Sequence, residues 1–378
     1  MMYFDSAATS LQKPREVSRA VCYAMQNLSS PGRGGYDSAM RAADQVLDCR
    51  QELAELFRVP SPERVVFTSS CTHGLNIALN SLVSPGSRVV VSGYEHNAVI
   101  RPLAALGAVV DVAAGRVFEP EEILRAYEKR LPGAACAVCC HVSNVFGYIL
   151  PLEEIAALCR RFKVPLVVDA AQSAGSIALN FSGLGCVFAA MPGHKGLLGP
   201  QGTGVLLCGD KLPEPLLLGG TGSASEDTHM PRELPDRLEP GTHNVPGICG
   251  LLAGVRWLRK KKLNAVLRHE RELAQAFAEA VERIPGVQVY RAKDFCLQSG
   301  VVSIGLDTMD CEEAALSLGR DYDIAVRAGL HCAPLAHRTV GTLERGTVRF
   351  SFSPFNTHRE VDSAVRAVAR LMTGRKTI

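Results

Sequence analysis

A lysine in a glycine-rich stretch is a candidate for a catalytic residue in this chain. Lys195 stands in "GHKGLLGPQGTG", and glycines allow a ligand to approach the backbone closely. A lysine whose pKa is lowered can form a Schiff base with a carbonyl compound. The stretch lacks the G-x-x-x-x-G-K-[ST] pattern of a P-loop. A surface lysine in a glycine-rich loop is the alternative.

Two polar residues after the apolar run "PLVV" would suit an aromatic ring that accepts electrons. Asp169 could pair with a protonated pyridine nitrogen, which strengthens such a cofactor. Gln172 could reach the phenolic oxygen of the same ring. Alternatively, Asp169 only caps the following turn.

The junction "TSSCTHG" joins an expected strand to an expected helix. Backbone N–H groups at a helix N-terminus bind phosphate, and Cys71 and Thr72 lie there, although Ser and Thr also act as ordinary N-caps. His96 begins a later helix, where its imidazole could stack on a ring or be only a polar end residue. Together with Lys195 and Asp169, these groups predict a pyridoxal 5'-phosphate (PLP) site.

Cys332, in "RAGLHCAPLAH", is one of thirteen cysteines, and it lies beyond an apolar run rather than inside it. A cysteine reacts as the thiolate, so a reactive Cys332 needs a group that lowers its pKa. The neighbouring His331 is one candidate for that group. The alternative is a packed cysteine in a loop, because free cysteines are most often buried.

The elements that must position these residues alternate along the chain. Apolar strands are expected over 64–70, 87–93, 135–144 and 164–173, and helices over 72–82, 96–107 and 151–162. Such strands indicate a largely parallel sheet covered on both faces, with ligands at the carboxyl ends of the strands. The polar clusters "TSSCTH", "GYEHN", "HVSN" and "DAAQ" fall at those ends.

The C-terminal third has a different pattern. A helical pattern over 251–283 precedes shorter strands over 301–306, 323–328 and 347–353, and a final helix starts near His358. We therefore expect an α/β fold with two domains. The large cofactor-binding domain covers residues 15–255, and a smaller α+β domain with the Cys332 loop covers 256–378 together with 1–14.

Composition excludes several classes of function. The formal charge of +3 over 378 residues gives no reason to expect nucleic acid or an acidic membrane as partner. We expect no secretory signal and no membrane span, hence a cytoplasmic protein with reduced thiols. No metal site is expected, because Cys136 and Cys139 of "CAVCC" would point to opposite faces of a strand and pack in the core.

The sequence resembles the class V, fold-type I family of PLP-dependent aminotransferases. Within that family it is similar to the SufS-like group of cysteine desulfurases and selenocysteine lyases. The stretches that carry this resemblance run nearly from end to end: "YFDSAATS", "EHNAVIRPL", "HVSNVFG", "VVDAAQSAG", "GHKGLLGPQGTG", "EPGTHNVPGICGL", "RAGLHCA" and "VRFSFSPFNT".

The resemblance implies a role for each matching residue. It makes Lys195, Cys332 and His96 catalytic, with Cys332 the nucleophile that accepts sulfur and His96 the ring that stacks on the cofactor. The residues implied to bind the cofactor are Cys71, Thr72, His96, Asn144, Asp169, Gln172, His194, Lys195 and Thr242, with Thr242 serving the partner subunit of a homodimer. Asn144 and Arg349 would bind substrate, and Arg349 would hold its carboxylate.

The implied reaction converts L-cysteine to L-alanine and leaves a persulfide on Cys332, from which sulfur passes to an acceptor protein or reductant. Three alternatives stay open: a selenocysteine lyase acting on L-selenocysteine, another class V aminotransferase or lyase, and a catalytically quiet sulfur-carrier scaffold. Pro192, His73 and Leu330 depart from the family's usual Ser, Glu and first His, which puts rate and substrate preference in question.

Overall fold

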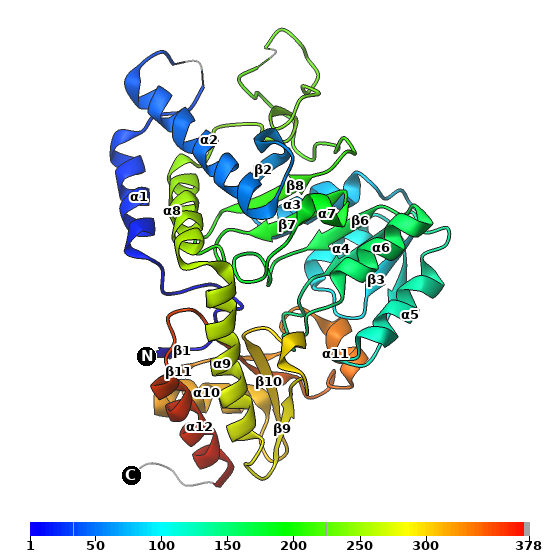
Figure 1. Cartoon of the computed structure of the whole chain (residues 1–378), viewed down its shortest axis with the longest axis vertical. Helices are drawn as coiled ribbons and strands as arrows, with labels where there is room; N and C mark the ends of the chain where they lie inside the picture. Colours follow the sequence, from blue (N-terminus) through cyan, green and yellow to red (C-terminus); the bar gives the residue numbers. More distant parts are fainter. Residues whose placement is uncertain (33, 224, 374–378) are drawn as a thin grey trace.

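The computed structural model describes residues 1–32, 34–223 and 225–373. The larger part is a seven-stranded sheet with strand order β2-β8-β7-β6-β5-β3-β4 (Figure 1). Only β8 runs antiparallel to its neighbours, so the expected largely parallel sheet is confirmed. The strands are β2 (Val65–Thr68), β3 (Arg88–Ser92), β4 (Val109–Ala113), β5 (Cys136–Cys140), β6 (Leu166–Asp169), β7 (Phe188–Pro192) and β8 (Gly204–Cys208).

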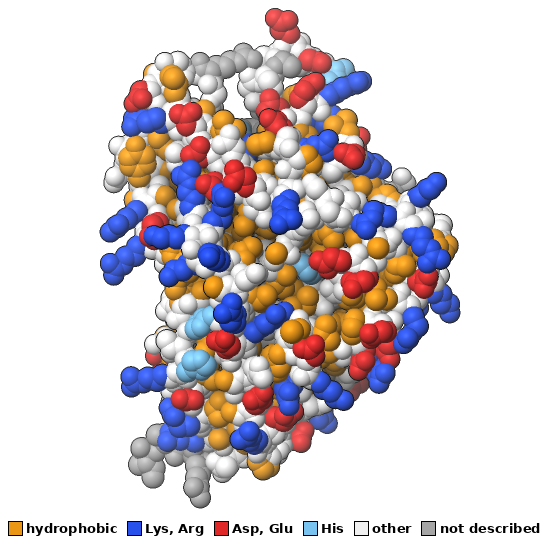
Figure 2. Space-filling view, viewed as in Figure 1, with side chains coloured by type: hydrophobic (Ala, Val, Ile, Leu, Met, Phe, Trp, Pro, Cys, Tyr) orange, Lys and Arg blue, Asp and Glu red, His pale blue; other side chains and the backbone are white. Residues whose placement is uncertain are grey.

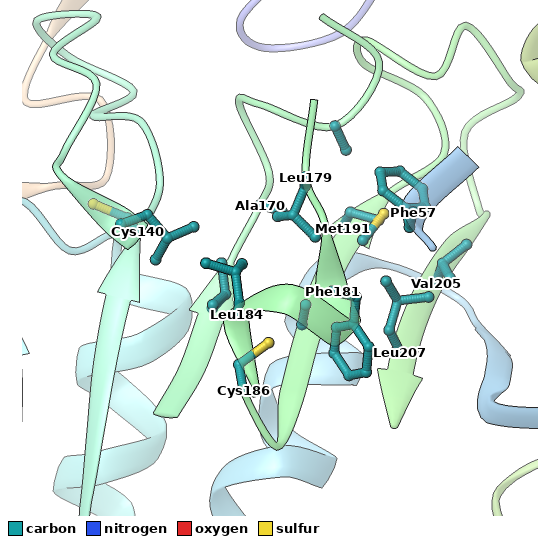
Figure 3. Close-up of a cluster of buried hydrophobic side chains, with 14 of the residues drawn as sticks. Phe57, Cys140, Ala170, Leu179, Phe181, Leu184, Cys186, Met191, Val205 and Leu207 are labelled. Carbon is teal, nitrogen blue, oxygen red and sulfur yellow. The ribbon is translucent and has the colours of Figure 1, made fainter. Parts of the chain in front are cut away.

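Helices cover both faces of this sheet. One hydrophobic core joins the sheet to α3 (Cys71–Asn80) and α4 (Asn97–Ala105), and another joins it to helices on the opposite face. Cys136 belongs to the first core and Cys139 to the second, as expected for a strand. Figure 3 shows part of the second core, where Phe57 and Phe181 pack near Met191 and Leu207. The opposite-face helices are α2 (Asp37–Phe57), α5 (Pro120–Arg130), α6 (Leu152–Phe162), the short α7 (Phe181–Leu184) and α8 (Val245–Lys261), which also packs against α1 (Arg15–Asn27).

A smaller antiparallel sheet forms the other part, with strand order β12-β13-β10-β9. Its strands are β9 (Val287–Tyr290), β10 (Val301–Leu306), β12 (Arg327–Gly329) and β13 (Thr347–Ser351). Its core also takes residues from α9 (Leu263–Val281), α10 (Cys311–Tyr322) and α12 (His358–Thr373). Strand β1 (Met2–Tyr3) pairs with β11 (Ile324–Ala325), and Phe4 lies in this core. The exact domain boundaries stay a prediction.

Two expected elements are wrong in detail. The helical pattern over 251–283 is two helices, α8 and α9, because Lys262 between them takes a left-handed conformation with φ 66°. In Figure 1, α9 runs from α8 down into the smaller part. The segment 323–328 is likewise two short strands, β11 and β12, which pair in different sheets.

The distribution of charged side chains agrees with the small formal charge of +3. Side chains of both charge signs are interspersed over the face shown in Figure 2. Within residues 1–32, 34–223 and 225–373, no helix combines the length and the apolar character needed to cross a membrane.

Candidate active site

A cavity of about 110 Å³ lies at the carboxyl ends of the central strands, and we call it the cofactor cavity. Arg349, Cys332 and Thr242 were expected at the site but do not line this cavity. The residues expected from the sequence that do line it are Cys71, Thr72, His96, Asn144, Asp169, Gln172, His194 and Lys195.

Lys195 lies in a tight loop between β7 and β8 that needs its glycines. A Cβ atom at Gly196 would lie 2.3 Å from the carbonyl oxygen of Ala174, so a side chain there would displace the backbone. The pKa of Lys195 is lowered, chiefly by burial, while the nearby Asp169 opposes the shift. A lysine with a lowered pKa has more of the neutral amine that attacks a carbonyl carbon.

Asp169 presents one free carboxylate oxygen at the end of β6. Its Oδ1 accepts a hydrogen bond from the Ala171 N–H (2.8 Å) and lies 3.5 Å from the Cys71 thiol. No described residue donates a hydrogen bond to Oδ2. Burial, reinforced by Asp169, raises the pKa of Cys71 well above its usual value, so this thiol stays protonated and donates. The free oxygen suits a protonated ring nitrogen.

His96 is the N-cap of α4. Its Nδ1 accepts a hydrogen bond from the Ala98 N–H (3.0 Å), so the proton of the neutral ring is on Nε2. Burial lowers the pKa of His96, which favours that neutral ring. A neutral imidazole fixed as a cap can stack on a flat cofactor ring without adding a charge.

The N-terminus of α3 provides a place for a phosphate. The Ser70 side chain accepts a hydrogen bond from the His73 N–H, whereas the N–H groups of Cys71 and Thr72 are first-turn donors without an acceptor in the described chain. His194 contacts the Thr9 hydroxyl (3.0 Å), and burial lowers its pKa to about 4.

The departure at Pro192 has a simple consequence: this buried residue at the end of β7 has neither a hydroxyl nor an N–H to offer a phosphate. The cavity nevertheless fits PLP. It offers a free carboxylate oxygen, free N–H donors and a lysine of lowered pKa.

Arg349 is a buried cation with an unused donor. Its guanidinium donates to Asp5 (2.7 Å) and to the carbonyl oxygen of Asn144 (3.0 Å), while its Nε is buried without a partner. The Arg349 charge contributes to lowering the pKa values of both Lys195 and His96, so it acts on the cofactor cavity. An unpartnered buried guanidinium N–H suits a substrate carboxylate.

Cys332 lies exposed in a tight turn between β12 and α11 (Pro334–Val340). The carbonyl oxygen of Cys332 accepts from the Asn97 N–H (2.8 Å), and that of His331 accepts from the Asn144 side chain (2.8 Å). His331 and Cys332 both have left-handed backbones, with φ of 50° and 56°. Two such non-glycine residues are strained and persist only where surrounding contacts impose them. The turn is therefore held against the rim of the cofactor cavity.

His331 cannot activate Cys332 as an imidazolium, so this expectation from the sequence is wrong. Its ring is buried, with Nε2 against Thr347, and stacks on His337. Burial, with Arg349 nearby, lowers the pKa of His331 to about 2. The ring is neutral and serves the packing of the turn.

Two residues that the sequence did not single out complete the site. Asp5 holds Arg349, and the Asn97 N–H holds the Cys332 turn. Asp5 stands in "YFDSAATS" and Asn97 in "EHNAVIRPL", two of the stretches that carry the resemblance. Their position inside those stretches is the signal that could have identified them.

The comparisons with known proteins agree with this geometry. The family model "Aminotransferase class-V" matches residues 2–364. A "probable cysteine desulfurase" of Methanothermobacter thermautotrophicus is 31% identical, over 95% of this chain and 92% of that protein.

Solved structures are similar over nearly the whole chain. The apo cysteine desulfurase of Thermococcus onnurineus has a TM-score of 0.91 at 31% identity, over 99% of this chain and 95% of that one. The cysteine desulfurase CsdA of Escherichia coli has a TM-score of 0.85 at 28% identity, over 98% and 94%. The chain belongs to the class V aminotransferase family of PLP-dependent enzymes.

Proposed function

We propose that this protein is a cysteine desulfurase, which converts L-cysteine to L-alanine and keeps the sulfur as a persulfide on Cys332. The observation that carries the proposal is the Cys332 turn, whose backbone binds Asn97 and Asn144 beside the cofactor cavity. A transaminating enzyme needs Lys195 but has no use for a thiol at that place. Relatives named cysteine desulfurase support the same choice.

Substrate binding falls to Arg349. Asp5 and the Asn144 carbonyl fix its guanidinium, and the Nε without a partner would donate to the carboxylate of L-cysteine. PLP, when bound, supplies an electron sink at the cavity. Asp169 offers its free Oδ2 to the ring nitrogen, and Lys195 Nζ takes up the proton that leaves the substrate's Cα.

Sulfur transfer falls to Cys332. Its thiolate Sγ attacks the substrate sulfur, so that a new S–S bond forms while the substrate's Cβ–Sγ bond breaks. The electron pair left on Cβ takes up a proton, and Lys195 Nζ returns the earlier proton to Cα, which gives alanine while the persulfide stays on the enzyme. An acceptor thiol, on a protein or a small reductant, then removes the sulfur.

The test compares wild type with Cys332→Ala on three substrates: L-cysteine, L-selenocysteine, and L-alanine with a keto acid. A desulfurase yields alanine and sulfide from L-cysteine, with most of that activity lost in Cys332→Ala. Unchanged sulfide release by the variant contradicts the role of Cys332. Selenide release that survives while cysteine turnover is lost supports a selenocysteine lyase. Turnover of L-alanine alone supports an aminotransferase, and no reaction after PLP is added supports a scaffold.

We also propose that the enzyme is a homodimer in which Thr242 completes the partner's site. Thr242 is exposed and does not line the cofactor cavity of its own chain. It is nevertheless held in place, because its neighbour His243 contacts Glu239 (2.6 Å), and Glu239 forms a buried ion pair with Arg50.

An exposed apolar run of three leucines, Leu216–Leu218, precedes Thr242 in the segment between β8 and α8. Exposed apolar side chains in a row favour a contact with another chain. Light scattering should give the mass of two chains, and Thr242→Ala should weaken PLP binding without changing that mass. A monomer with full PLP affinity would contradict both statements. The cytoplasmic location stays a prediction.

A further inference from the structure

A second cavity, of about 50 Å³, adjoins the cofactor cavity and has no role in the mechanism above. It shares Lys195 and Gln172 with the cofactor cavity and extends between α9, β10 and β13. Six serines lie among the residues that line it, so we call it the serine cavity. Lys195 and Glu270 are the only ionisable side chains among the residues that line it.

The serine cavity has polar groups without partners and room for water. The hydroxyl groups of Ser6 and Ser299 are buried in its wall without a hydrogen-bond partner, and Ser299 is only 4% exposed. Unsatisfied buried polar groups cost free energy, and an ordered water usually satisfies them. Since one water needs roughly 10–15 Å³ of such volume, this cavity has room for a short chain of waters.

Glu270 stands at the α9 side of this cavity. The helix packs closely there, since a Cβ atom at Gly300 would lie 2.8 Å from the Cβ of Glu270. No residue of the described chain forms an ion pair or a hydrogen bond with the Glu270 carboxyl group. The residue as a whole is only half-buried, but burial of the carboxyl group raises its pKa to about 8, so the group can both release and take up a proton near neutral pH.

The other charged groups nearby have their own partners. Lys13 donates to the hydroxyl of Ser10 (2.6 Å) at the edge of the cavity, and burial lowers its pKa to about 8. His269, next to Glu270 on α9, contacts the Asn356 carbonyl oxygen (2.9 Å), and Arg349 of β13 binds Asp5. None of them lines the serine cavity, in which Lys195 is the other ionisable residue.

We propose that waters in the serine cavity connect Lys195 Nζ with the Glu270 carboxyl group, and that Glu270 exchanges protons with Lys195 during the reaction. In one direction, the Glu270 carboxylic acid gives a proton through the waters to the neutral amine, which leaves a carboxylate and an ammonium group. The reverse transfer restores both groups, so charge and protons balance. The catalytic part of this proposal rests on the desulfurase function proposed above.

Infrared difference spectroscopy on the full-length protein, with and without PLP, tests the proton on Glu270. Wild type minus Glu270→Gln should show a carboxylic-acid C=O band at neutral pH, which should disappear as the pH rises well above 8. The matched control is Glu272→Gln, two residues along α9 and exposed, which should give no such band. Absence of the band in the Glu270 difference spectrum overturns the proposal, and this result does not depend on any activity.

Kinetics of the holoenzyme test the exchange. Glu270→Gln should lower kcat for alanine formation about tenfold, leave the KM for L-cysteine unchanged, and increase the solvent deuterium isotope effect. Glu270→Asp keeps a carboxyl group and should recover part of the rate, while Glu272→Gln should match wild type.

The outcomes separate the two proposals. Wild-type kcat and isotope effect in Glu270→Gln, in an enzyme that forms alanine, overturn the proton exchange alone. No alanine from wild type overturns the desulfurase function instead. Circular dichroism melting establishes that each variant folds, and Ser299→Ala offers a milder variant that should lower kcat in the same direction by disturbing the waters. An unchanged isotope effect in a folded Ser299→Ala protein argues against the water chain.

Discussion

The cofactor cavity and the Cys332 turn hold their functional groups in place by different interactions. The cavity is walled by side chains at the ends of parallel strands, and burial sets their protonation states, as for Lys195 and His96. Cys332 is exposed in the turn, and hydrogen bonds from the Asn97 N–H and the Asn144 side chain to backbone carbonyl oxygens hold the turn in a strained left-handed conformation. The cavity thus sets the protonation states of its groups. The turn sets only the position of Cys332 and leaves its thiol accessible to an acceptor.

The largest effects should separate these two regions. Lys195→Ala should abolish the visible absorbance of the bound cofactor and lower alanine formation on the order of 10³-fold or more, because both binding and proton transfer use Nζ. Cys332→Ala should keep the absorbance and lose the sulfur transfer. Visible spectra and alanine assays check both, with exposed Lys211→Ala as the control. Loss of the absorbance in Cys332→Ala would contradict the division of roles.

A smaller effect is expected at Arg349, which lies between the two regions. Arg349→Lys keeps the charge but loses the Nε donor and the fixed planar guanidinium, so KM for L-cysteine should rise on the order of tenfold with a smaller change in kcat. The matched control is Arg327→Lys, since Arg327 is exposed on β12 and is the register partner of Arg349. Equal KM values for both variants would show that Arg349 does not bind the substrate carboxylate.

The pH dependence of stability should report on the turn. His331 has a pKa of about 2 in the folded protein, well below the value near 6.5 expected in the unfolded chain, so the unfolded state binds the extra proton. Stability is therefore full above about pH 6.5 and falls as the pH drops, by about 2 kcal/mol at pH 5 from this residue alone.

Urea unfolding at pH 7 and pH 5 measures this loss. The difference between the two pH values should be smaller in His331→Gln than in wild type, because the variant has no imidazole to protonate at that site. Exposed His358→Gln should keep the wild-type difference. His337 and His141 also have lowered pKa values and will keep part of the pH dependence. An identical difference in His331→Gln and wild type would show that the ring is not buried in solution.

The sequence predicted the cavity better than the turn, for a physical reason. Residues such as Asp169 and His96 follow apolar strands, and the carboxyl ends of parallel strands meet at one edge, so position in the chain gives position in space. The break between α8 and α9 has no such signal. Lys262 has a positive φ, but a lysine is compatible with a helical pattern, so the sequence does not mark the break. The neutral state of His331 could not be predicted from the sequence either, because it depends on burial of the ring against Thr347, sixteen residues further along the chain.

The smallest effect is expected at Leu330, where the resemblance would place a second histidine. Its side chain is 37% exposed and precedes the two left-handed residues, so it contributes little to packing. Leu330→His should change the free energy of unfolding by less than about 0.5 kcal/mol. If the backbone contacts to Asn97 and Asn144 alone position Cys332, cysteine turnover should change by less than about threefold, the equivalent of roughly 0.6 kcal/mol. A much larger gain in turnover, measured as alanine formed per PLP bound, would mean that side chains of the turn also activate the Cys332 thiol. The turn would then resemble the cofactor cavity, whose side chains affect the pKa of Lys195.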